Sequence, residues 1–402
     1  MNAATASGEL PLSLQTRLAE RTEAGARFFG AEAERLAQLC HLMAERFARG
    51  GRLIAFGRSP EARSDARHVA VEFVHPVIVG KRALPAIALT GEGGDLRTQV
   101  ALLVEESDIA VAFGAGEPDG EAAAAVALAR ERGALTLAFA GVGAEWELGP
   151  PAEDPSIRQE LVETLYHVLW ELVHVFFDHR GLLTGRQGRT GHDPGPSSFL
   201  YPFLDERESD LQRVLDDVAR SVRMKAQEIG ELRAQTVAEN ASTLTAAADA
   251  LRGRLQVGGQ LLAFGNGGSA TDAMDVVADF RAGRGSAPGW PAIDLTEDPG
   301  IITAIANDIG AEAIFSRQVI ALGRSGDVLL ALSTSGNSAN VIAALAEARR
   351  RGLLTIALVG YDGGRVAAEG LADHVIVTRS EHIPRIQEAQ ATAYHVLREL
   401  VG

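Results

Sequence analysis

An internal duplication leaves this 402-residue chain few ways to fold. The segment ARERGALTLAFAG (129–141) recurs as ARRRGLLTIALVG (348–360), and RQELVETLYHVLWELV (158–173) recurs as IQEAQATAYHVLRELV (386–401). Four further pairs match in the same order: 45–57 with 252–265, 64–73 with 271–280, 84–90 with 290–296, and 107–113 with 326–332. Ordered self-similarity of this kind marks repeated architectures, so the chain contains two tandem copies of one domain.

The segment between the copies differs in composition from both. GLLTGRQGRTGHDPGPSS (181–198) is rich in Gly and Pro and has no helical or strand periodicity, which is typical of a linker or surface loop. We therefore expect a first domain over residues 1–180, a linker over 181–204 and a second domain over 205–402. A chain of 402 residues agrees with two or three domains of ordinary size.

Within each copy, short apolar runs alternate with helical patterns. The runs are RLIAFG, AIAL, IAVAF and LTLAF in the first copy, and QLLAFG, AIDL, VLLAL, LTIAL and HVIV in the second. Short, nearly continuous apolar strands between helices indicate a parallel sheet that is buried on both faces. We expect an α/β fold of two doubly wound parallel sheets flanked by helices, with ligands at the carboxyl ends of the strands.

Charge and cysteine content exclude several classes of function. Lys and Arg number 38 against 53 Asp and Glu, a net charge of −15, which disfavours nucleic-acid binding and a basic membrane-surface helix. Cys40 is the only cysteine, so one chain can form neither a disulfide nor a cysteine-based zinc site. The N-terminal residues do not resemble a signal peptide, and no run of 18 apolar residues occurs. We expect a soluble, cytoplasmic protein.

Two loops of the second copy are candidates for binding a phosphate. Gly265-Asn266-Gly267-Gly268-Ser269 follows the run LLAF, and Ser333-Thr334-Ser335-Gly336-Asn337-Ser338 follows VLLAL. Each loop precedes a predicted helix, where backbone N–H groups and the helix dipole attract anions. A serine-rich turn is often only a helix cap, and GNGGSA also fits a dinucleotide-binding pattern. Four hydroxyl side chains without a lysine suit a phosphate monoester better.

The second copy resembles the phosphoheptose isomerases, a family within the sugar-isomerase (SIS) domain proteins. The likeness rests on three stretches: GNGGSATDAMDVVADF, AIANDIGAEAIFSRQVIALGRSGDVLLALSTSGNSANVI and RIQEAQATAYHVLREL. It covers nearly all of residues 205–402 and implies two tandem SIS domains. It further implies hydroxyl ligands for the phosphate and polar residues around the sugar. These are Ser269, Ser333, Thr334, Ser335 and Ser338 for the phosphate, and Asn266, Gly267, Asp308 and Gln387 for the sugar.

The family also carries a quartet of polar side chains. A His and a Glu lie four residues apart on one helix, and a Gln and a His lie eight apart on the last helix, so that each pair can face one site. The first copy has all four, as His68, Glu72, Gln159 and His167; by the resemblance this quartet is a candidate site for a divalent metal, zinc above all. The second copy keeps Gln387 and His395 but has Asp275 and Asp279 at the other two positions.

The first copy departs from the family in its loops. GRSPEARS (57–64) and GAGEPDG (114–120) replace the phosphate-binding sequences, and Glu61, Glu117 and Asp119 bring negative charge to them. The first copy also lacks a counterpart of AIANDIGAEAIF. We therefore expect the first domain to have lost phosphate binding while it keeps catalytic-type residues.

The resemblance implies an aldose–ketose isomerase that converts sedoheptulose 7-phosphate to D-glycero-D-manno-heptose 7-phosphate through an enediol. Glu72 or Asp279 would be the base, and His167 or His395 the acid. The two halves could share one site, or the first could be a structural partner of a self-contained second half. A non-catalytic SIS protein that binds sugar phosphates or acts as a scaffold is the alternative. Family members are commonly tetramers of single domains, so we expect a homodimer of this chain.

Overall fold

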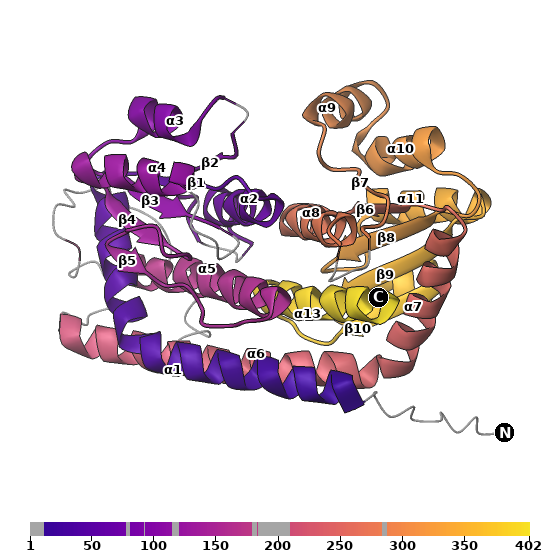
Figure 1. Ribbon diagram of the computed structural model, residues 1–402, viewed down its shortest axis with the longest axis horizontal. Helices are drawn as coiled ribbons and strands as arrows, with labels where there is room; N and C mark the ends of the chain where they lie inside the picture. The colour runs from indigo at the N-terminus through magenta and orange to yellow at the C-terminus, as the bar shows by residue number, and fades with distance from the viewer. Residues whose placement is uncertain are drawn as a thin grey trace. The chain divides into compact units, whose positions relative to one another are not determined.

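The computed structural model describes residues 12–77, 81–91, 93–114, 120–178, 183, 210–283 and 288–402 (Figure 1). These residues form two compact units. The first unit comprises residues 23–228, and the second unit comprises residues 229–402 together with residues 12–22. Among the described residues, no helix is both long enough and apolar enough to cross a membrane.

The first unit contains a five-stranded parallel sheet in the order β2-β1-β3-β4-β5. Its strands are β1 (Leu53–Phe56), β2 (Ala86–Leu89), β3 (Ile109–Ala112), β4 (Leu135–Ala138) and β5 (Trp146–Glu147). Its helices are α1 (Leu12–Ala48), α2 (Pro60–Val74), α3 (Leu96–Leu103), α4 (Gly120–Glu131), α5 (Pro155–Asp178) and the beginning of α6 (Leu211–Glu239). The four apolar runs of the first copy all form strands, whereas the two-residue β5 gave no such signal.

The second unit repeats this topology. Its strands are β6 (Leu261–Phe264), β7 (Ala292–Asp294), β8 (Val328–Ser333), β9 (Leu354–Gly360) and β10 (His374–Thr378), paired in parallel in the order β10-β9-β8-β6-β7. Its helices are α7 (Ala241–Gln256), α8 (Gly268–Arg281), α9 (Pro299–Asp308), α10 (Ile314–Leu322), α11 (Ala339–Arg350), α12 (Gly364–Ala368) and α13 (Ile383–Val401), with a 3₁₀ turn at Ala311–Ala313. Both sheets thus have the doubly wound order 2-1-3-4-5, which confirms the predicted fold class.

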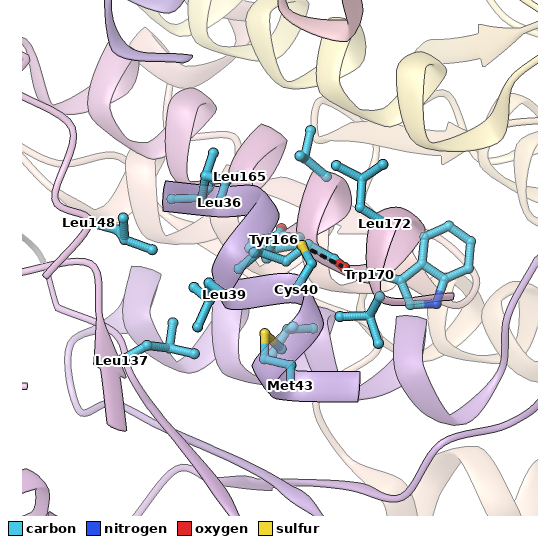
Figure 2. Close-up of a cluster of buried hydrophobic side chains, with 14 of the residues drawn as sticks. Leu36, Leu39, Cys40, Met43, Leu137, Leu148, Leu165, Tyr166, Trp170 and Leu172 are labelled. Atoms are coloured by element: carbon cyan, nitrogen blue, oxygen red, sulfur yellow. Dashed lines mark hydrogen bonds between the residues drawn. The ribbon is translucent and has the colours of Figure 1, made fainter. Parts of the chain in front are cut away.

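Alternating side chains of the strands fill two apolar layers in each unit. In β1, Leu53 and Ala55 belong to one buried cluster and Ile54 and Phe56 to another, as the two-residue period of a strand requires. Figure 2 shows part of the first cluster, in which Cys40 of α1 is fully buried and faces α5. Burial raises the pKa of the Cys40 thiol far above its usual value, so this cysteine is an inert core residue.

Each unit completes its core with a helical segment from the other half of the sequence. Leu14 and Leu18, at the start of α1, belong to the buried cluster of the second unit. Val214, Val218 and Val222, near the start of α6, belong to a buried cluster of the first unit. The expected domain boundaries at 180 and 205 do not include this exchange, because an amphipathic pattern does not say which core its apolar face joins.

A buried aspartate at the same place in each copy accepts hydrogen bonds from residues that precede the central strands of the sheet. In the first unit, Asp108 accepts hydrogen bonds from the backbone N–H groups of Arg52 and Glu105 (2.8 and 2.9 Å) and from the Arg52 guanidinium (2.7 and 3.2 Å). Burial alone would raise the pKa of Asp108, but these hydrogen bonds outweigh it and lower the pKa. In the second unit, Asp327 accepts from the backbone and side chain of the neutral Gln260 (3.0 and 3.1 Å).

Asp108→Asn is therefore expected to destabilise the protein at pH 7 by about 1–3 kcal/mol, the usual cost of losing hydrogen bonds to a charged group. Because the folded-state pKa is depressed, the carboxylate stabilises the wild type above its unfolded pKa of 3.8, and this contribution is lost as the pH falls through the lower folded value. Denaturant unfolding at several pH values should show the difference between variant and wild type shrinking in acid. Asp327→Asn is the matched control and should cost less, since its partner side chain carries no charge. An undiminished difference at low pH would contradict this account.

Candidate active site

The two phosphate-loop candidates lie at the switch point of the second sheet. β6 and β8 are neighbours, and the chain leaves them toward opposite sides of the sheet order, which is where doubly wound sheets bind ligands. The loop after β6 leads into α8 through Gly267, whose φ of 59° suits glycine. The loop after β8 leads into α11 through Ser338. The fold therefore brings the two loops to one edge, as the sequence predicted.

The loop after β8 has hydroxyl groups held by backbone N–H groups. The backbone N–H of Gly336 donates to Ser333 Oγ (3.1 Å), and that of Asn337 donates to Ser335 Oγ (3.2 Å). A serine hydroxyl that accepts one hydrogen bond still has its own proton to donate. Ser338 is the N-cap of α11, yet its side chain makes no capping hydrogen bond. The loop thus offers O–H donors and a helix N-terminus, the groups that hold a phosphate.

An amide pair that the sequence did not reveal joins the loop after β6 to the first turn of α11. Asn266 Nδ2 donates to Asn340 Oδ1 (3.0 Å), and Asn340 Nδ2 donates to Asn266 Oδ1 (2.9 Å). Asn266 was expected to line the sugar; in the structure its amide bridges the first loop to α11. Ser269 is buried at the start of α8. The only signal for the pairing was the presence of a second amide, Asn340, just after the serine-rich loop.

The structure places the two other expected sugar contacts on helices α9 and α13. Asp308 is the exposed last residue of α9, and its Oδ1 accepts a hydrogen bond from Asn307 Nδ2 (2.7 Å). Gln387 is buried in the first part of α13. Thr334 is half-buried between Ser333 and Ser335.

A carboxylate and an imidazole meet where α8 packs against α13. Asp279 Oδ2 lies 3.4 Å from His395 Nε2, and the His395 side chain is only 3% exposed. Arg398, also buried, donates to the backbone carbonyls of Asp279 (3.0 Å) and Ala282 (3.2 Å) and so fixes the end of α8. Asp275 is buried one turn earlier on α8. The side chain of Asp279 therefore reaches His395, although aspartate is shorter than the glutamate that the family resemblance implies at this position.

In the first unit, the corresponding helix N-terminus is filled by the chain itself. Ser59 Oγ accepts the backbone N–H of Ala62 (3.2 Å), Pro60 removes another N–H, and Glu61 adds a negative charge in the first turn of α2. These features leave little to attract a phosphate. Glu117 and Asp119 of the other loop lie outside the described residues.

The histidines of the first-unit quartet are brought together in the core. His68 Nε2 lies 3.3 Å from His167 Nε2 and 3.9 Å from Glu72 Oε1, while His68 Nδ1 lies 2.8 Å from the Tyr166 hydroxyl. His68, Glu72 and His167 are each at most 2% exposed. Burial, and then the neighbouring His167, lower the pKa of His68 well below its usual value, so its imidazole is neutral near neutral pH.

The amide nitrogen of the fourth residue, Gln159, bonds to Asp65, and an unpredicted residue, Glu163, lies with the histidines. Gln159 Nε2 donates to Asp65 Oδ1 (3.4 Å), and burial, followed by the charge of Glu61, raises the pKa of Asp65 well above its usual range. Glu163 instead lies with His68 and His167, so that one ligand atom from each falls within 4.8 Å of the others. Two imidazoles and a carboxylate at this spacing fit a divalent metal ion. The signal in the sequence was the four-residue spacing from Gln159 to Glu163 to His167.

Comparison with known proteins places the chain in a family. Residues 226–360 match the model of the SIS domain. The chain is 43% identical to the phosphoheptose isomerase of Chlorobium phaeobacteroides over 203 residues, 49% of this chain and 85% of the relative. It is 41% identical to the phosphoheptose isomerase of Thermodesulfovibrio yellowstonii over 186 residues, 46% of this chain and 92% of the relative.

A solved structure extends the likeness in fold to the whole chain. The C-terminal domain of glucosamine-fructose-6-phosphate aminotransferase from Francisella tularensis superposes with a TM-score of 0.61, covering 100% of this chain and 97% of that one. At 9% identity this likeness shows the fold alone. The sequence relatives carry the closer assignment: this chain belongs to the phosphoheptose isomerase family of SIS-domain proteins, a family of sugar-phosphate isomerases.

Proposed function

We propose that the chain isomerises sedoheptulose 7-phosphate to D-glycero-D-manno-heptose 7-phosphate. The observation that carries the proposal is the pair of loops at the β6/β8 switch point, where Ser333 and Ser335 keep hydroxyl protons for a phosphate. The relatives, each of which matches about half of the chain, are named phosphoheptose isomerases. The absence of Lys and Arg from both loops fits a phosphate held by neutral donors and a helix N-terminus.

The phosphate loop and the Asp279–His395 pair are well separated along α8. Ser269 and Asp279 are ten residues apart on this helix, which is about 15 Å along its axis. A seven-carbon sugar that is anchored through its terminal phosphate extends farther from the phosphate loops than a triose or pentose phosphate does. A heptose phosphate therefore suits this separation better than a shorter sugar.

Asp279 and His395 are the residues we assign to proton transfer. Asp279 would take the proton from C1 of the ketose while His395 donates a proton to the C2 oxygen, which gives the enediol. Asp279 would then return its proton to C2, and His395 would recover a proton from the C1 hydroxyl as the aldehyde forms. The 3.4 Å separation of their side chains allows both to face the same two carbons.

The first unit would hold a divalent ion, zinc by the family resemblance, near His68, Glu72 and His167. Such an ion supplies Lewis-acid polarisation of an oxygen when bound. Because the second unit has both the phosphate loops and the Asp279–His395 pair, we assign binding and proton transfer to it. A site shared between the halves and a homodimer stay predictions.

The test is to incubate the purified wild-type protein with sedoheptulose 7-phosphate and to follow the aldoheptose phosphate by chromatography, with and without added zinc. Turnover is the expected result, with fructose 6-phosphate and ribulose 5-phosphate as shorter comparison substrates and slower reactions. Faster turnover of a shorter sugar would overturn the substrate. Binding without any turnover would favour the non-catalytic alternative. That alternative is supported by the replacement of the family His and Glu by Asp275 and Asp279.

A further inference from the structure

We infer that Glu163 is a metal ligand of the first unit, in the place that the family pattern gives to Gln159. With His68 and His167 it forms a site of two imidazoles and one carboxylate for a divalent first-row transition metal. The inference rests on the proposed presence of a metal in this unit, and it does not depend on the identity of the sugar.

The two histidines have the separation that a shared ion requires. Two nitrogen ligands that bind a tetrahedral ion at about 2.0–2.1 Å are about 3.3–3.4 Å apart, and His68 Nε2 lies 3.3 Å from His167 Nε2. The other nitrogen of His68, Nδ1, lies 2.8 Å from the hydroxyl of Tyr166. When Nδ1–H donates to that hydroxyl, Nε2 has its lone pair directed toward His167, as in metal sites whose histidines are oriented by a second partner.

Glu163 brings a carboxylate to this pair from the same helix as His167. The two residues are four apart on α5, one helical turn, so their side chains lie on one face. Glu163 is 1% exposed, and one of its oxygens is within 4.8 Å of the ligand nitrogens of both histidines. A carboxylate buried with two imidazoles supplies the negative charge that a divalent cation bound between them would need.

The second unit has neither the carboxylate of Glu163 nor the imidazole of His68. Ala391 stands at the position that corresponds to Glu163, and Asp275 stands at the position of His68. His395, the counterpart of His167, instead lies beside Asp279. The carboxylate at position 163 thus accompanies the complete pair of histidines and is absent where one of them is missing.

Glu72 can complete the coordination, because its Oε1 lies 3.9 Å from His68 Nε2, while the amide nitrogen of Gln159 donates to Asp65 Oδ1. A set of imidazole and carboxylate donors without thiolates favours zinc, cobalt, iron or manganese over magnesium and calcium. The chain is therefore expected to bind one such ion tightly.

The test titrates the metal-free protein with Co²⁺ and Zn²⁺. One equivalent per chain should bind, and bound Co²⁺ should show the visible absorption of a low-coordinate nitrogen and oxygen site. Glu163→Ala, which installs the second unit's residue, should weaken zinc affinity by more than about 100-fold, beyond the 10–100-fold typical of losing a second-shell partner. Gln159→Ala should weaken it by less than about 10-fold, as for a residue outside the ligand set.

Glu160→Gln is the matched control, because Glu160 is on the same helix and equally buried but outside the cluster. It should bind metal as the wild type does. Circular dichroism and thermal melts of each metal-free variant separate loss of the site from loss of the fold. If Glu163→Ala misfolds, Glu163→Gln serves in its place. Wild-type affinity in a folded Glu163 variant, loss of affinity only in Gln159→Ala, or no metal bound by the wild type would each overturn the inference. None of these outcomes depends on turnover.

Discussion

Asp279→Asn is expected to lower the turnover of sedoheptulose 7-phosphate by about 100- to 10,000-fold, the range typical of losing a general base. The asparagine keeps the size of the side chain and can still face His395, but it cannot take a proton from carbon. The phosphate loops are untouched, so KM should change little. Steady-state kinetics of the purified variant, with aldoheptose phosphate as the product, measures both constants.

Glu72→Gln is the matched variant, because it makes the same chemical change at the corresponding position of the first unit. We expect it to retain most of the turnover and, with Glu72 near His68, to alter metal affinity instead. The opposite result, with turnover lost in Glu72→Gln and kept in Asp279→Asn, would transfer the role of base to the first unit. It would also support the prediction that the halves share a site.

Ser338→Asp is expected to abolish binding of the sugar phosphate while the fold is retained or slightly stabilised. An aspartate at the N-cap of α11 would accept the N–H groups that a phosphate needs and would repel its negative charge. Losing a charge-assisted hydrogen bond and facing a like charge together cost about 3 kcal/mol or more, which is more than about 100-fold in affinity. The same carboxylate interacts favourably with the helix dipole by about 0.3–1 kcal/mol.

Calorimetric titration with sedoheptulose 7-phosphate and with inorganic phosphate measures this effect, and a thermal melt checks the fold. Ser59→Asp is the control, since Ser59 is the N-cap of α2 in the first unit and already caps its own helix. It should leave affinity unchanged. If Ser338→Asp still bound phosphate as the wild type does, the loop after β8 would not be the phosphate site.

The parts of this structure that follow from local patterns could be predicted from the sequence. The duplicated apolar runs gave nine of the described strands, and their order along the chain fixed the edge at which GNGGS and STSGNS would meet. Strand β5 was not predicted, because a segment of two residues, Trp146 and Glu147, is too short to show periodicity. The hydrogen bond between Asn266 and Asn340 was not predicted for a related reason. It depends on how helices pack, and no spacing within a single element indicates such a contact.

The candidate metal ligands show the same difference between what local patterns predict and what depends on packing. His68 and His167 could be named because the repeat aligned them with a family pattern, and the structure brings their nitrogens together. Which carboxylate or amide accompanies them depends on the rotation of α5 against α2. That rotation brings the amide nitrogen of Gln159 to Asp65 and places Glu163 with the histidines. Both contacts are determined by tertiary packing.

The exchange of helical segments between the two cores has a consequence for how such a chain can change over evolutionary time. A gene fused from two copies can ordinarily be split again at the linker, because each product keeps its own hydrophobic core. Here a split near residue 190 would separate Val214 and Val218 from the first core, and Leu14 and Leu18 from the second. Each fragment would expose apolar surface that only the other covers. The duplication is therefore hard to reverse by splitting the gene, and the halves can diverge in function only while they remain one polypeptide.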